Sequence, residues 1–108
     1  MLKLIAFLVL AAGGVSAEAA EVTLLGNPNC GDWIKVNSAV DRAWLAGYMS
    51  GLNVGISPNS KLDSLDGMTG NQVYLWMDNY CKANPLSDLN RGGNELQIQL
   101  ERRRKPVR

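Results

Sequence analysis

The sequence predicts an all-α protein, a small single-domain bundle of three to four helices held by one disulfide. Apolar residues recur every three or four positions in three segments, and strand-like alternation is nearly absent. The chain has two cysteines behind an export-type leader, so both can pair in an oxidising compartment. About 90 residues follow this leader, and a core of that size is marginal without a disulfide.

Residues 1–20 have the three parts of a secretory signal peptide. A lysine near the start precedes an apolar run from Leu4 to Ala12, and small residues follow as far as Ala20. The apolar run is too short to cross a bilayer, which requires about 20 apolar residues. Cleavage after residue 17, 19 or 20 fits the pattern. We therefore expect a protein exported to the periplasm, with no stable membrane anchor.

Cys30 and Cys81 are the two cysteines, and we expect them to form a disulfide. Closing a loop of about 50 residues stabilises a fold by about 4 kcal/mol in the chain-entropy model. A reactive thiol favours a basic neighbourhood, whereas Cys30 is followed by Gly31 and Asp32. The pair is therefore expected to hold the fold together and not to act as a reagent.

The first predicted helix runs from about Ser38 to Asn53. Before it, residues 22–25 form an apolar patch that could be a short strand, and residues 26–29 form a turn. Gly47 and Gly51 lie one helical turn apart, so we expect another element to approach the backbone there. The predicted apolar stripe consists of Val40, Trp44, Tyr48 and Leu52, with Leu45 and Met49 beside them.

A loop is predicted over residues 55–70, with Leu62 and Leu65 tucked beneath it. The second helix starts at residues 69–71 and ends at Asn84, because a residue before proline is pushed out of the helical region. Its predicted buried face consists of Val73, Trp76, Met77, Tyr80 and Cys81.

The third helix is predicted to open at Ser87 or Asp88, either of which is a good N-cap. Gly92 and Gly93 interrupt its apolar stripe and indicate either a kink or a close crossing against a tryptophan. The stripe consists of Leu86, Leu89, Gly93, Leu96 and Leu100.

Charge divides the exported chain into an acidic helical domain, residues 21–101, and a basic tail, residues 102–108. From Glu18 to Glu101 there are five basic and ten acidic residues, and five further cations lie in the tail. This distribution does not fit a nucleic-acid binder, whose basic residues interleave with exposed aromatics. The tail is expected to be disordered, with contact to anionic lipid or an acidic partner as the alternative.

The chain has no histidine, which removes the usual catalytic triads, the neutral-pH proton shuttle and the commonest transition-metal ligand. Asp63 and Asp66 could belong to a calcium loop, but their setting is that of turn-forming aspartates, and Leu65 occupies a position where a ligand would help. We therefore expect no enzyme activity, no catalytic residue, no metal and no cofactor.

Binding through apolar surface remains as a route to function. After removal of the leader the chain has three tryptophans, three tyrosines and no phenylalanine, and the first two types are favoured at interfaces. Burial of the tryptophans in the core is the alternative for each. Tyr74 falls off the predicted buried face of its helix. The candidate binding residues are Trp33, Trp44, Tyr48, Tyr74 and Trp76.

The order and spacing of several short motifs resemble the HdeA family of small periplasmic, disulfide-bonded helical proteins. The similarity covers roughly residues 29–100. The residues that carry it are Cys30-Gly31-Asp32-Trp33-Ile34, Gly47-Tyr48, Leu52-Asn53, Leu62-Asp63, Gly67, Val73 and Cys81.

This resemblance implies an acid-stress chaperone, a homodimer at neutral pH that loosens in acid and exposes apolar surface to unfolding client proteins. Protonating ten carboxylates would take the exported chain from a net charge of zero to about +10, and such repulsion favours opening. Two alternatives bind one partner: an immunity protein that inhibits a secreted toxin, or an accessory subunit of an envelope complex.

Overall fold

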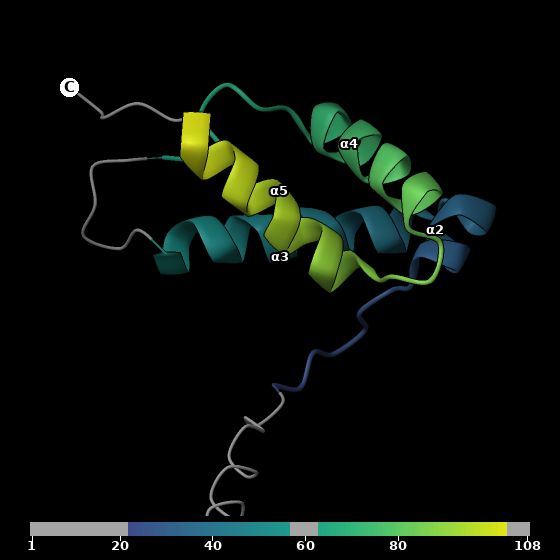
Figure 1. The fold of residues 1–108 in the computed structure, drawn as a ribbon. Coiled ribbons are helices and arrows are strands. Elements are labelled where there is room, and N and C mark those ends of the chain that lie inside the picture. The colour runs from purple at the N-terminus through teal and green to yellow at the C-terminus, as the bar shows by residue number, and fades with distance from the viewer. Residues whose placement is uncertain (1–21, 57–62, 104–108) are drawn as a thin grey trace, which may run out of the picture.

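The computed structural model describes residues 22–56 and 63–103 (Figure 1). These residues form four helices, which are α2 (Cys30–Val36), α3 (Ala39–Ile56), α4 (Gly70–Ala83) and α5 (Leu89–Arg103). No strand occurs in the described ranges, so the strand alternative for residues 22–25 is wrong. The all-α class and the single disulfide are confirmed. The predicted signal peptide lies outside the described residues.

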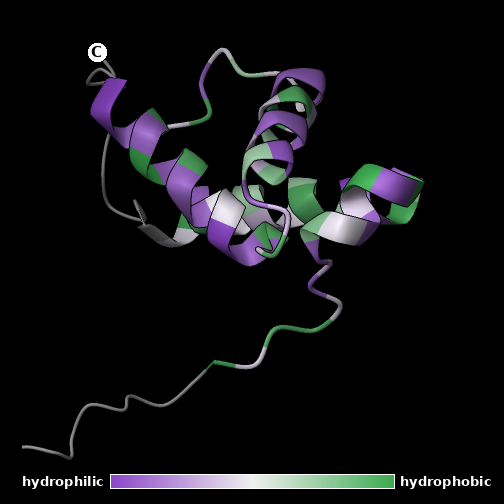
Figure 2. Cartoon of the chain, turned by 45° about the vertical axis from the view of Figure 1, so that its right-hand side comes forward, coloured by the Kyte–Doolittle hydropathy of each residue, from purple (hydrophilic) through white to green (hydrophobic). Residues whose placement is uncertain are grey.

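The three long helices pack around one core. In Figure 1, α5 crosses α3, and α4 leads down to α2, against which it packs. Figure 2 shows hydrophilic and hydrophobic residues together on α4 and on α5, as expected for helices with one buried face. The buried core residues are Cys30, Trp33, Leu45, Met49, Val73, Met77, Cys81, Leu89, Leu96 and Leu100.

The short helix α2 was not predicted. The Asn29 side chain caps its start by accepting a hydrogen bond from the Asp32 backbone N–H (2.7 Å). Asn37 ends it in the left-handed conformation, with φ of 51°. The seven residues between these caps are too few to show a helical period, and the burial of Cys30 and Trp33 anchors the helix to the core.

The predicted ends of α4 and the predicted start of α5 are confirmed. Thr69 and Gln72 form a capping box at the start of α4, and the helix stops before Pro85. The Asp88 carboxylate accepts from the Arg91 backbone N–H (2.9 Å) at the start of α5. This helix continues to Arg103, two residues into the predicted basic tail, and residues 104–108 lie outside the described ranges.

Gly92 and Gly93 mark a close crossing, and α5 continues through both residues. A Cβ atom at Gly92 would lie 2.7 Å from Met77 Sδ and 2.8 Å from Tyr80 Cδ2. One at Gly93 would lie 2.9 Å from the Tyr48 ring. The groups that approach are thus two methionines, Met77 and Met49, and two tyrosines, and not a tryptophan as predicted.

Three expectations about which residues pack against the rest of the protein are wrong. Gly47 and Gly51 have nothing within 4 Å of an added Cβ, so no element among the described residues approaches them. Val40, in the first turn of α3, is 77% exposed. Leu86 is 97% exposed, because it lies in the turn before α5. Leu65 packs against the core as expected, whereas Leu62 lies outside the described residues.

Candidate functional site

The disulfide joins α2 to the C-terminal half of α4. Cys30 and Cys81 are both fully buried, with an S–S distance of 2.04 Å and a Cα–Cα distance of 5.0 Å. The predicted pairing is confirmed. A fully buried disulfide of this kind is typical of proteins that fold in an oxidising compartment.

Trp33 belongs to the core, so its proposed role as exposed binding surface is wrong. Its side chain is 1% exposed, and its Nε1–H donates to Asp78 Oδ1 at 2.7 Å. The disulfide draws α2 against α4, and this places the indole between the two helices. The aspartate that receives the bond was not predicted, because the contact spans 45 residues.

Tyr74 is half-buried beside Trp33. The two ring centroids are 6.3 Å apart with the planes at 55°. The Arg42 guanidinium carbon lies 5.9 Å from the Tyr74 centroid, which is a cation–π contact between α3 and α4. The ring therefore joins three helices and is not a free surface group.

The other candidate residues belong to two W-x-x-x-Y pairs on different helices. The α3 pair is Trp44 and Tyr48, whose rings are 5.0 Å apart and 10° from parallel. The α4 pair is Trp76 and Tyr80, at 5.4 Å and 11°. A spacing of four residues brings both rings to one face of a helix, which explains the similar geometry.

The α3 pair is covered by the chain itself. Trp44 Nε1–H donates to the Leu25 carbonyl at 2.7 Å, and Gly26 lies against the indole. The Tyr48 hydroxyl donates to Asn94 Oδ1 and accepts from Asn90 Nδ2, both at 2.6 Å. Every polar group of this pair is therefore bonded within the chain.

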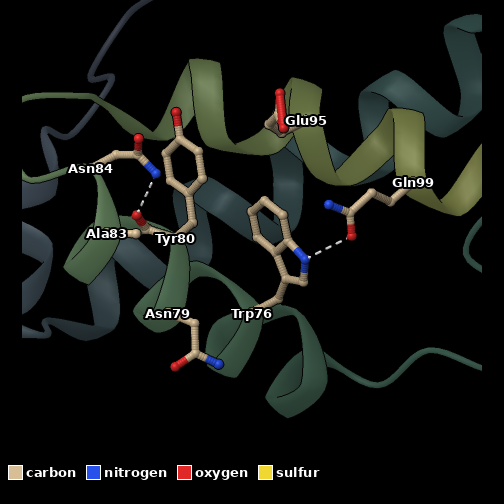
Figure 3. Close-up of a pocket in the computed structure, with 7 residues that line it drawn as sticks. All are labelled: Trp76, Asn79, Tyr80, Ala83, Asn84, Glu95 and Gln99. Carbon is tan, nitrogen blue, oxygen red and sulfur yellow. Dashed lines mark hydrogen bonds between the residues drawn. The ribbon is translucent and has the colours of Figure 1, made fainter.

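The α4 pair lies in a groove of about 480 Å³ between α4 and α5 (Figure 3). Trp76 Nε1–H donates to Gln99 Oε1 at 3.1 Å, and the Tyr80 hydroxyl lies 2.8 Å from Ser87 Oγ. These bonds hold both rings in place before any ligand arrives. The groove is lined by Trp76, Asn79, Tyr80, Ala83, Asn84, Glu95 and Gln99.

The electrostatics of the groove favour positive charge. Glu95 is the one charged residue among those that line it. The groove also reaches Ala83, the last residue of α4, where the unpaired carbonyls form the negative end of the helix dipole. The Tyr80 carbonyl is not one of them, because it accepts from the Asn84 backbone N–H at 2.8 Å and from Asn84 Nδ2 at 2.9 Å.

A second hollow adjoins the groove at Asn84. It is lined by Asn84, Pro85, Leu86, Ser87 and Arg91. Leu86, at 97% exposure, is the most exposed of the large apolar residues described. We call the groove and this hollow together the α4–α5 surface. It combines two aromatic rings, amide groups, one leucine and two opposite charges.

The structure separates the predicted binding residues into three places instead of one site. Trp33 and Tyr74 lie together near the disulfide, Trp44 and Tyr48 form the covered pair, and Trp76 alone reaches the groove. The other residues of the α4–α5 surface were missed as binding candidates, among them Tyr80, Leu86, Glu95 and Gln99. The repeated W-x-x-x-Y spacing could have identified Tyr80, whereas nothing in the sequence places Gln99 beside Trp76.

Within residues 22–56 and 63–103, no three His, Cys, Asp or Glu side chains are grouped so that they could hold a metal ion. None of the helices in these ranges is long and apolar enough to span a membrane. No protein-family model matches the chain, and no curated protein or solved structure matches it either.

Proposed function

We propose that this chain is an exported periplasmic protein that acts by binding a protein partner at the α4–α5 surface. The observation that carries this proposal is the preformed aromatic floor of the groove beside the nearly fully exposed Leu86. Large apolar side chains in water are unfavourable, and an exposed leucine next to held Trp and Tyr rings gains most when a partner covers all three.

The residue types on this surface fit a protein interface. Trp, Tyr and Arg dominate the binding energy of most interfaces, and Trp76, Tyr80 and Arg91 are all present here. Because the rings are already held by hydrogen bonds, little side-chain entropy is lost on binding. Such preorganisation suits one folded partner, such as a toxin to be inhibited or a larger subunit of an envelope complex.

A photo-cross-linking experiment tests this proposal. A benzoylphenylalanine placed at Asn79, which is exposed and lines the groove, should yield one discrete cross-linked protein in the native host. The same group at Asn71, exposed on the first turn of α4, is the matched control and should yield none. Identical products at both positions, or no product at Asn79, would contradict partner binding at this surface.

An HdeA-like acid-stress chaperone is the second candidate, and two observations favour it. Nine large apolar side chains are exposed within the described residues. In addition, protonating ten carboxylates would raise the charge of the exported chain, counted from Glu18, from zero to about +10, which favours opening of a small fold and of any homodimer. The disulfide would then limit how far α2 and α4 separate.

The two candidates differ in pH dependence. The oxidised protein would be mixed with an enzyme that unfolds in acid, and light scattering recorded at about pH 2 and about pH 7. A chaperone should suppress aggregation at the lower pH alone, while the Asn79 cross-link to a single partner should form at neutral pH. Absence of suppression at the lower pH would remove the chaperone candidate.

A further inference from the structure

We propose that the groove between α4 and α5 receives an arginine side chain of the partner, with its guanidinium over the α4 pair and close to Glu95. This inference rests on the proposed protein binding and adds the chemistry of the group that is bound. The partner is thereby identified as a protein with an exposed arginine on the segment that enters the groove.

The aromatic floor is the first support. Trp76 and Tyr80 are 11° from parallel, and Figure 3 shows the two rings next to each other between α4 and α5. A planar cation can lie over such rings and interact with the negative charge of their faces. The same molecule already uses this contact once, where the Arg42 guanidinium lies 5.9 Å from the Tyr74 centroid.

The second support is charge complementarity. Glu95 stands on α5 at the edge of the groove, and within the described residues its carboxylate has no hydrogen bond or ion pair (Figure 3). The C-terminal end of α4 adds partial negative charge at Ala83. Arg91 lies in the adjoining hollow and not in the groove. The groove therefore selects a cation, and an acidic group of the same partner can pair with Arg91.

Hydrogen-bond acceptors are the third support, and they favour arginine over lysine. Asn84 Nδ2 donates to the Tyr80 carbonyl, and the Asn84 side-chain oxygen is left to accept a hydrogen bond from a ligand in the groove. Gln99 Oε1 takes one bond, from Trp76, and an amide oxygen can accept two. A guanidinium has five donors in one plane, so it can bond such acceptors while its face lies on the rings. An ammonium group has three donors that do not lie in one plane, so it fits this arrangement of rings and acceptors less well.

The test uses acetyl-Gly-Arg-Gly-amide as the probe and NMR as the readout. The protein has three tryptophans, and their indole N–H signals can be followed separately. We expect the Trp76 indole and the Gln99 side-chain amide signals to shift in a saturable way. The citrulline peptide has the same shape without the charge and should bind about threefold to tenfold more weakly. The lysine peptide should bind more weakly than the arginine peptide.

Two variants check that the site is the groove. Glu95→Gln should weaken binding of the arginine peptide by about threefold and leave citrulline binding unchanged. Asp66→Asn removes one exposed carboxylate from the loop before α4 and should leave binding of both peptides unchanged. An unaltered spectrum outside the groove will show that each variant is folded.

Three outcomes would overturn the inference: equal affinity for the arginine and citrulline peptides, no effect of Glu95→Gln, or tighter binding of chitotriose than of the arginine peptide. The last would assign the groove to a glycan. Protein binding itself is tested separately by the Asn79 cross-link. A discrete cross-link combined with equal peptide affinities would therefore reject arginine recognition and leave the proposed partner binding intact.

Discussion

The α3 and α4 pairs have the same local chemistry and different surroundings. Each is a Trp followed four residues later by a Tyr, and the ring planes are 10° and 11° from parallel. In the α3 pair, Trp44 is bonded to the chain's own Leu25 carbonyl, whereas Trp76 borders an open groove. Helical spacing thus sets how two rings lie together, and the segment packed against them decides whether they remain available.

The helix α5 contacts both pairs and does not cause this difference. Gly92 lies against Tyr80, and the next residue, Gly93, lies against Tyr48. The difference arises from Leu25 and Gly26, which contact Trp44 and have no counterpart over the α4 pair in the described part of the chain. The Asn27 side chain fixes this segment by accepting from the Asn90 backbone N–H at 3.1 Å.

The largest difference between α3 and α4 is the disulfide, because Cys81 lies in α4 and α3 has no cysteine. Replacing both Cys30 and Cys81 with Ser should lower the free energy of unfolding by about 4 kcal/mol, since the two residues are 51 apart in sequence. Urea unfolding would measure the loss. Amide exchange should rise first in α2, which depends on the bond for its place on α4.

The control is the wild-type protein in a strong reductant, which should match the double variant. Wild-type stability that does not change on reduction would contradict a stabilising role for the bond.

Replacing Trp44 or Trp76 with alanine tests whether a tryptophan covered by the chain contributes more to stability than one that borders a groove. Trp44→Ala should cost about 3 kcal/mol, because it removes the bond to Leu25 and the packing of Gly26. Trp76→Ala should cost about 1 to 2 kcal/mol, because the ring borders the groove and its loss leaves less of a cavity. Urea unfolding of both variants makes the comparison, and equal losses would show that coverage of the α3 pair adds nothing.

An added methyl group on α5 tests how firmly each tyrosine is held. Gly93→Ala should destabilise by about 1 to 2 kcal/mol, because the Tyr48 ring is 2.9 Å from the new Cβ and is fixed by two hydrogen bonds. Gly92→Ala should cost less, because the atoms nearest its new Cβ, at 2.7 and 2.8 Å, belong to the flexible end of the Met77 side chain. Thermal unfolding would rank the two.

Gly47→Ala is the matched control on α3. Nothing lies within 4 Å of its added Cβ, so the gain in helix propensity should stabilise the protein by about 0.5 to 1 kcal/mol. Destabilisation by this variant would mean that the exposed face of α3 is covered by another molecule.

The long helices could be predicted because their signals are local. Thr69 and Gln72 cap α4, Pro85 stops it, and Asp88 opens α5, each through a contact within a few residues. Whether a single helix residue is buried or exposed was harder to predict. A glycine pair permits a close approach without showing that one occurs, so Gly47 and Gly92 look alike in sequence and differ entirely in packing.

The candidate site was predicted in part for the same reason. Trp76 was identified by its residue type, but the opposite side of its groove is formed by Glu95 and Gln99 of α5. Gln99 lies 23 residues away in sequence and meets Trp76 because α4 and α5 cross at Gly92. Trp33 failed as a surface candidate because its burial depends on α2, a helix too short to be recognised from periodicity.

The smallest expected change in stability comes from Leu86→Ser, and it tests whether the α4–α5 surface serves binding alone. A side chain that is 97% exposed loses almost no packing on truncation, so the free energy of unfolding should change by less than about 0.5 kcal/mol. The yield of the Asn79 cross-link should nevertheless fall. Val54→Ser, on an exposed position of α3 at 71% exposure, should leave that yield unchanged. A cross-link that survives Leu86→Ser would confine the binding surface to the groove.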